Sequence, residues 1–345
     1  MIRIKKDYFC INNPFVLKKL FVSACFFSAV LSFAQEGENV FPFMNLPVSA
    51  RQAALGGDAV SVRDYDVNFA AVNPALLNLE MDNQISVNFA TYLADSKFGT
   101  INYGKAFEKG HLITANARYM DYGKMPRTDE AGFEMGEFGA MDAAIGAGYA
   151  YQFEDEWTVG ANVNFITSKI DTYTSMAVSG NIGVSYHFKK TNETIGLAIR
   201  NFGYQFKTFN GYRETLPFRI DLGYTVHLKK FPAAITVTAH DLQKFDISSE
   251  YNNNGQEVKT TRKIADHFSL GAELFPEKSF NLRIGYNIKR GNELSVLDQR
   301  SFAGLSAGFG VKLGAFRIDY THARYHNSGN LNMLGVSVDM SGNRY

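Results

Sequence analysis

The chain has 345 residues, of which 46% are hydrophobic, 14% aromatic and 20% charged, and its formal net charge is +1. So much apolar content excludes a disordered chain, because its burial offsets the entropy lost on ordering. A charge near zero excludes the clustered basic excess of a nucleic-acid-binding protein. The 29 Phe, 18 Tyr and 30 Gly favour a fold of strands and tight turns.

Residues 1–34 have the pattern of an export signal. Basic residues up to Lys19 precede an apolar run that ends in the small residues of the cleavage position, Ser32-Phe33-Ala34. From Leu20 to Ala34 this run has 15 residues, fewer than the roughly 20 of a membrane-spanning helix. Cleavage after Ala34 is therefore favoured over a retained anchor.

Removal of the signal changes the chemistry expected of the chain. It takes five basic residues and Asp7, which leaves a net charge of −3, and it takes both cysteines, Cys10 and Cys25. The exported chain then has no disulfide, thiol nucleophile or thiolate metal site.

Residues 35–83 do not alternate like strands. Ser49 is a typical N-cap, and Gly56-Gly57 is a typical stop, so the sequence predicts a short helix between them. The Asn73-Pro74 turn follows. The segment is either a periplasmic extension or a hatch folded into the lumen of a barrel.

From residue 84 onward, apolar and polar residues alternate with period two, the pattern of strands. Most of these segments reach the 9–11 residues with which a tilted strand crosses a bilayer. Their number is even, as in bacterial single-chain barrels. The fourteen segments are 84–92, 96–107, 110–122, 139–153, 156–170, 174–188, 193–206, 215–229, 233–246, 264–275, 279–290, 300–312, 314–325 and 330–340.

The connections alternate in length. Every second one is a short turn, whereas several of the others are long loops: 123–138, 207–214, 247–263 and 291–299. Short turns on one rim and long loops on the other are typical of outer-membrane barrels, with the N-terminus on the short-turn side. The sequence therefore predicts an all-β, 14-stranded antiparallel transmembrane barrel over 84–345.

An eight-stranded barrel is filled by its own side chains. A fourteen-stranded barrel is wider, so we expect other residues to fill its lumen. Glycines on the lumen side, such as Gly304, Gly308 and Gly310, leave room for it. We therefore favour the hatch for residues 35–83.

Residues 46–77 resemble the N-terminal signature of the PorV/PorQ family. The segments are Leu46 to Gly57, Val60 to Asp64 and Asn73 to Leu77, and the strands agree only in number and pattern. The residues taken as the hatch motif are Leu46, Pro47, Arg51, Gly56, Gly57, Asn73 and Pro74.

The resemblance implies a fold and a function. PorV/PorQ proteins are outer-membrane barrels of the type IX secretion system, related to the fatty-acid transporter FadL, with fourteen strands and a hatch. Chain length and loop sizes resemble PorQ, which implies a non-enzymatic barrel that holds a PorZ-like surface partner, with PorU- and PorV-like subunits nearby. The alternatives are a PorV-like shuttle for cargo with C-terminal sorting domains and a FadL-like transporter of hydrophobic small molecules.

Two long loops carry apolar side chains suited to docking a protein partner. Packing of these side chains over the barrel mouth explains them equally well. The candidate residues are Met125, Phe133, Met135, Phe138, Phe209 and Tyr212. Outer-membrane lipid is the other expected partner.

No motif indicates catalysis, a metal or a cofactor. Asp64-x-Asp66-x-Asn68 begins like a calcium loop but has Phe69 and Ala75 where Gly and Glu are required. His240-Asp241 lacks the Gly-x-Ser-x-Gly elbow of a hydrolase. We expect no enzyme activity.

Overall fold

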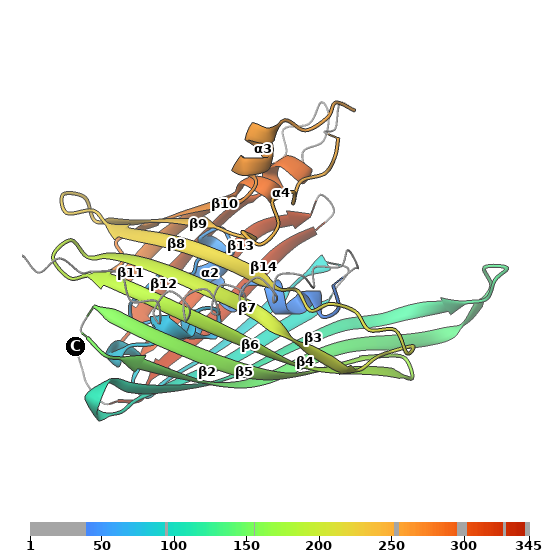
Figure 1. The fold of residues 1–345 in the computed structure, drawn as a ribbon, viewed down its shortest axis with the longest axis horizontal. Helices are drawn as coiled ribbons and strands as arrows, with labels where there is room; N and C mark the ends of the chain where they lie inside the picture. The colour runs from blue at the N-terminus through green and yellow to red at the C-terminus, as the bar shows by residue number, and fades with distance from the viewer. Residues whose placement is uncertain are drawn as a thin grey trace, which may run out of the picture. The chain divides into compact units, whose positions relative to one another are not determined.

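The computed structural model describes residues 39–93, 96–154, 156–251, 255–294, 302–326 and 329–341. The expected export signal, 1–34, lies outside the described residues. The described chain forms a closed barrel of fourteen antiparallel strands, each paired with its neighbours in sequence, and β1 pairs with β14 (Figure 1). This confirms the expected fold class.

The strands are β1 Gln84–Thr91, β2 Lys97–Ala106, β3 His111–Thr128, β4 Glu134–Gln152, β5 Trp157–Ile170, β6 Tyr173–Phe188, β7 Glu193–Lys207, β8 Arg219–His227, β9 Ala233–Ala239, β10 Phe268–Leu274, β11 Phe280–Asn287, β12 Leu305–Leu313, β13 Phe316–His326 and β14 Gly329–Asp339. Two short helices, α3 Thr260–Ala265 and α4 Ile288–Glu293, lie in the long connections, and a 3-10 turn, η7 Glu108–Gly110, joins β2 to β3. Among the described residues no helix is long and apolar enough to cross a membrane.

The barrel has an apolar outer face and a polar inner face. Phe89, Ile101 and Ile145 point outward and are exposed, whereas the inward Asn88 and Asn116 are buried. A soluble protein has the reverse arrangement, while a barrel in lipid requires this one. Much of the 46% hydrophobic content therefore forms an outer surface.

Aromatic rings gather at the short-turn ends of β4, β5 and β6. Trp157 and Tyr186 have ring centroids 4.7 Å apart, and Tyr186 meets Phe188 edge-on at 4.6 Å. Tyrosine and tryptophan at strand ends form the interfacial girdles of membrane barrels.

Residues 39–83 pack inside the barrel as a series of short helices, which we call the hatch. They are η2 Pro42–Asn45, α2 Ala50–Ala54, η3 Val67–Ala71, η4 Pro74–Leu76 and η5 Leu79–Met81. Residues 47–62 and 66–78 are all buried. Helix α2 has the predicted cap, because Ser49 Oγ accepts from Gln52 N at 3.1 Å, and Gly56 and Gly57 end it with φ of 92° and 95°.

Helix α2 spans the seam where β1 meets β14. On one side Ala50 N donates to Asn88 Oδ1 of β1 at 3.3 Å. On the other side Thr321 Oγ1 of β13 donates to Ala50 O at 2.5 Å, and Ser306 Oγ of β12 donates to Ala54 O at 3.0 Å. The hatch therefore contacts strands from both ends of the barrel sequence.

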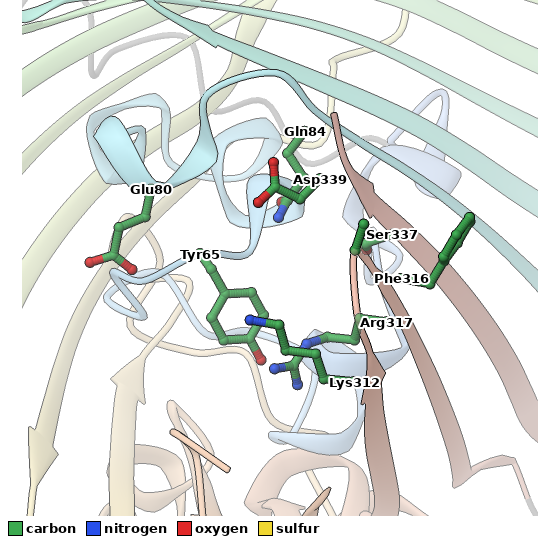
Figure 2. Close-up of a pocket in the computed structure, with 9 residues that line it drawn as sticks. Tyr65, Glu80, Gln84, Lys312, Phe316, Arg317, Ser337 and Asp339 are labelled. Carbon is green, nitrogen blue, oxygen red and sulfur yellow. The ribbon is translucent and has the colours of Figure 1, made fainter. Parts of the chain in front are cut away.

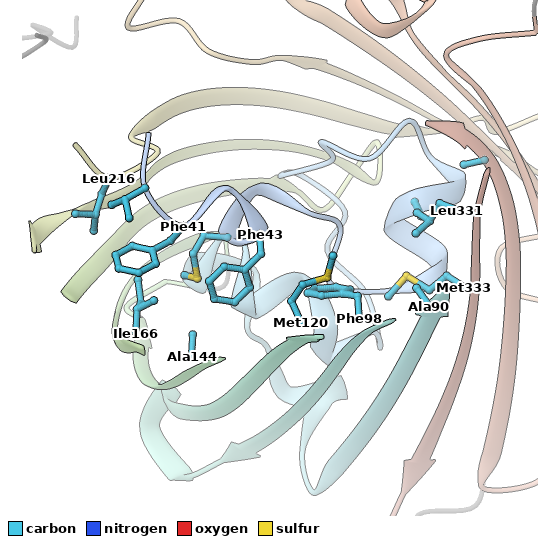
Figure 3. Close-up of a cluster of buried hydrophobic side chains, with 14 of the residues drawn as sticks. Phe41, Phe43, Ala90, Phe98, Met120, Ala144, Ile166, Leu216, Leu331 and Met333 are labelled. Carbon is cyan, nitrogen blue, oxygen red and sulfur yellow. The ribbon is translucent and has the colours of Figure 1, made fainter. Parts of the chain in front are cut away.

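An apolar cluster fills the long-loop end of the lumen (Figure 3). Phe41 and Phe43 of the hatch pack there with strand residues such as Phe98, Met120 and Ile166. A second cluster, which includes Leu77 and Met81, packs on Leu112 and Ala150 nearer the short turns. We call the first the outer apolar cluster.

The prediction of a long loop over 123–138 is wrong in part. β3 continues to Thr128 and β4 starts at Glu134, so most of the segment is a β-hairpin (Figure 1). Conversely, 240–246 and 264–267 lie outside the strands expected there. Positive φ at Gly123 and a register shift between Asp121 and Lys124 allow β3 to continue past the barrel.

Candidate functional site

Arg51 of α2 ties the hatch together and holds it to the barrel wall. Its side chain is 2% exposed. It donates to both carboxylate oxygens of Asp64, at 2.8 and 2.5 Å, and through Nη2 to Glu273 Oε2 of β10 at 2.7 Å. Such bidentate, charge-assisted contacts are the strong class of hydrogen bond.

The network continues along the wall. Arg283 of β11 donates to Glu273 Oε1 at 2.8 Å and to Asp319 Oδ1 of β13 at 2.5 Å. We call Arg51, Asp64, Asp66, Glu273, Arg283 and Asp319 the Arg51 cluster. It links the hatch to three strands through buried charges, which are expensive to separate.

Of the carboxylates in this cluster, Asp66 has the longest ion pair with Arg51. Its Oδ2 lies 3.7 Å from Arg51 Nη1, while the same guanidinium binds Asp64 and Glu273 more closely. Burial, together with repulsion by Asp64, raises the pKa of Asp66 to about 6. The hatch therefore contains a carboxyl group that ionises near neutral pH.

Asp58 anchors a second part of the hatch. Its Oδ1 lies 2.9 Å from Arg219 Nη2, and its Oδ2 accepts from Asn287 Nδ2 at 2.8 Å. Burial opposes ionisation, but Arg219 and His240 outweigh it and lower the pKa of Asp58 to about 2. His240 is itself buried and lies 2.8 Å from Asp241.

The Asn73-Pro74 turn fits against glycines of the wall. Asn73 Oδ1 accepts from Ala75 N at 3.1 Å, and its Nδ2 donates to Val60 O at 2.8 Å. A Cβ at Gly183 of β6 would collide with Asn73 Oδ1, and one at Gly196 of β7 with Val60 O. These glycines are required because hatch and wall approach so closely.

Sequence reasoning missed Gly183 and Gly196, because no local pattern tells which glycines meet the hatch. Of the three that it named, Gly308 meets the hatch, because a Cβ there would lie 3.0 Å from Ala54 Cβ, whereas Gly304 and Gly310 face residues of the barrel itself.

The remaining residues of the hatch motif have packing roles. Leu46 packs against the outer apolar cluster. Pro47 lies near Gly57, where a Cβ would also approach the Tyr325 hydroxyl at 2.8 Å.

A cavity of about 310 Å³ lies at the short-turn end, between the hatch and β12–β14 (Figure 2). Figure 2 shows Tyr65 between Glu80 and the two cations, Lys312 and Arg317. The Arg317 guanidinium stacks on the Tyr65 ring at 4.0 Å. The lining residues are Tyr65, Glu80, Gln84, Lys312, Ala315, Phe316, Arg317, Ser337 and Asp339.

With both charge signs in its lining, the cavity suits water or small polar solutes better than an apolar ligand. No group of three or more metal-ligating side chains occurs among the residues described.

The six candidate docking residues separate into two groups. Phe133, Met135 and Tyr212 are exposed by 71%, 66% and 78%. Met125, Phe138 and Phe209 are half-buried, and Phe209 packs against the outer apolar cluster. By location, four of the six candidates lie on the β3–β4 hairpin and the other two lie on the β7–β8 loop.

The β7–β8 loop also holds the start of the hatch. Val40 N donates to Thr215 O at 2.9 Å, and Thr215 Oγ1 donates to Asn39 Oδ1 at 3.0 Å. Residue 39 therefore lies at the long-loop rim, while Met81 lies near the short turns.

Comparison with solved structures finds channels for hydrophobic compounds. The CymD monoaromatic hydrocarbon channel matches with a TM-score of 0.53 at 10% identity, covering 85% of this chain and 97% of that chain. The Pseudomonas putida toluene transporter TodX matches with a TM-score of 0.50 at 10% identity, with the same coverage. A Pseudomonas aeruginosa FadL homologue matches with a TM-score of 0.48 at 11% identity, covering 85% and 98%. No family model and no curated protein sequence matches the chain.

At this identity the likeness shows the fold alone. The chain has a closed 14-stranded antiparallel barrel that is similar in fold to the CymD channel. The narrower resemblance to PorV/PorQ remains a prediction from residues 46–77.

Proposed function

We propose that this protein is a non-enzymatic outer-membrane anchor that holds an exported surface protein through its outer loops. The observation that carries the proposal is the filled lumen. Hatch residues 47–62 and 66–78 are buried throughout, and buried ion pairs join them to the wall. A barrel packed in this way suits a stable support.

The outer surface supports the same function. The β3–β4 hairpin carries Phe133 and Met135 well beyond the barrel, and exposed aromatic and Met side chains are enriched at protein interfaces. The signature in 46–77 resembles PorV/PorQ, so the partner we propose is a PorZ-like component of a type IX secretion and attachment complex. PorU- and PorV-like subunits are further candidates.

Affinity purification of the full chain from outer membranes in mild detergent tests this function. We expect an exported surface protein in near-stoichiometric amount, and its loss when residues 125–137 are replaced by Gly-Asn-Gly. The matched control replaces Lys189–Asn192, in a turn on the opposite rim, by glycine and serine and retains the partner.

Transport of hydrophobic small molecules is the second candidate function. The fold comparisons favour it over the anchor, since the matched structures are described as a monoaromatic hydrocarbon channel and a toluene transporter. Toluene uptake by intact cells that depends on this protein, with no surface protein recovered from the membranes, would replace the anchor by the transporter.

A further inference from the structure

The β3–β4 hairpin has two free edges beyond the barrel. β2 pairs with β3 only as far as Asp121, and β5 pairs with β4 only as far as Ala140. From Lys124 to Phe138 the two strands pair only with each other. Unpaired strand edges are templates for another strand.

The edge of β3 is blocked. Gly139 O accepts from Asp171 N at 3.0 Å, so the backbone of Gly139 faces away from β3. In an antiparallel ladder, successive residue pairs direct their backbone N–H and C=O groups alternately toward each other and away from each other. Met125 and Phe138 therefore direct these groups toward each other, and Pro126 and Glu137 direct theirs away, toward the free edges. Pro126, which has no N–H, therefore stands on the free edge of β3 and prevents pairing there.

The edge of β4 is open. Glu137 presents its backbone N–H and C=O to this edge, and no proline occurs between Glu134 and Phe138. A bulge at Gly136, where φ is 112°, bends the strand next to Glu137. The hairpin is also tied to the barrel, because Arg127 Nη2, near the end of β3, pairs with Asp171 Oδ2 of the β5–β6 turn at 2.5 Å. The open edge is thus held in place by the barrel.

The hairpin has an acidic end. Lys124 is paired with Glu137 at 3.2 Å and Arg127 with Asp171, so both cations are neutralised. Asp129, Glu130 and Glu134 supply the remaining charge. Asp129 Oδ1 also accepts from Ala131 N and Phe133 N, both at 2.9 Å, which fixes the turn.

We propose that the edge of β4 at residues 134–138 binds an extended segment of an exported protein in which basic and apolar residues alternate. The segment adds as a strand, its basic side chains meet the acidic end, and its apolar ones meet Met135 and Phe133. This inference rests on the proposed anchor function and names the surface through which it acts.

Hydrogen exchange on the full chain in nanodiscs tests strand addition. The probe is a synthetic octapeptide of alternating lysine and valine, and the comparison peptide alternates glutamate and valine. We expect the lysine peptide to slow amide exchange at 134–138 at least tenfold, and the glutamate peptide at the same concentration to have no effect.

Two sets of variants make the test specific. Glu137→Pro removes an N–H that the hairpin itself does not use, so it should abolish the protection, whereas the matched Glu137→Ala should retain it within about threefold in peptide affinity. Glu130→Lys with Glu134→Lys leaves the edge open and should reverse the preference between the two peptides.

Unchanged protection in Glu137→Pro, or protection by the lysine peptide outside 134–138, would overturn strand addition. Failure here is distinguishable from failure of the anchor function. If Glu137→Pro still recovers the surface protein from membranes while replacement of 125–137 does not, the anchor function stands and the edge inference is wrong.

Discussion

Arg51 is one guanidinium for three carboxylates, of which Asp66 and Glu273 are buried and Asp64 is half-buried. Removing it by Arg51→Met takes the common partner from Asp64 and from the buried Glu273, which keeps only Arg283, and breaking such a pair typically costs about 3–5 kcal/mol. We expect hatch amides from 50 to 69 to exchange at least 100-fold faster than in the wild type. Hydrogen exchange of the full chain in nanodiscs measures this.

The control is Lys124→Met, which breaks the exposed pair with Glu137. Exposed ion pairs contribute about 1 kcal/mol or less, so hatch exchange should not change. Equal effects of the two substitutions would show that Arg51 does not hold the hatch.

Asp66 gives the hatch a pH dependence with a definite sign. Its pKa is 3.8 in the unfolded chain and about 6 in the folded one. Between these values only the unfolded chain loses the proton, so the contribution of Asp66 to stability falls as pH rises from about 4 to 6 and stays low above it. The difference corresponds to roughly 3 kcal/mol.

Asp66→Asn removes this fall and retains the cap on η3 through its amide oxygen. At pH 7 the variant should therefore be more stable than the wild type, and at pH 4 the two should be equal. Thermal unfolding in detergent from pH 4 to 7 measures the difference, and parallel curves would contradict the assignment to Asp66.

At the scale of elements, removing the hatch should open the barrel. A chain without residues 35–83 loses the helices that occupy the lumen, so we expect single-channel conductance in planar bilayers to rise at least tenfold. The variant with 125–137 replaced is the control, because the hairpin lies outside the lumen. A closed, non-conducting barrel without its hatch would refute the lumen filling.

Elements could be predicted from the sequence where one local pattern decided them. The alternation in 316–321 predicted β13, and Ser49 with Gly56-Gly57 predicted α2, because pleat and cap each act within a few residues. The hairpin was missed because residues 126–137 are exposed on both faces, so neither face demands alternation.

The candidate site was harder to predict than the strands. Arg51 was named from a motif, but its partner Glu273 lies 222 positions away, and only closure of the barrel brings the two together. The same holds for Asp58 with Arg219, and for the glycines beside Asn73.

For the whole molecule, the outward apolar band predicts a depth-dependent cost of charge. Ile145 lies midway along the lipid-facing part of β4, whereas Leu313 ends β12 at the short-turn rim, and both are exposed. Ile145→Arg should cost about 2–4 kcal/mol and Leu313→Arg at most about 1 kcal/mol. Unfolding by guanidinium in lipid vesicles compares the free energies of the two variants. Equal losses of stability would contradict this position of the apolar band.

The position of α2 across the seam has a consequence for the order of biogenesis. Since Ala50 bonds to strands on both sides of the β1–β14 pairing, we expect the hatch to be in place when the first and last strands join. Residues 50–54 then act as a template on which the ends of the sheet find each other.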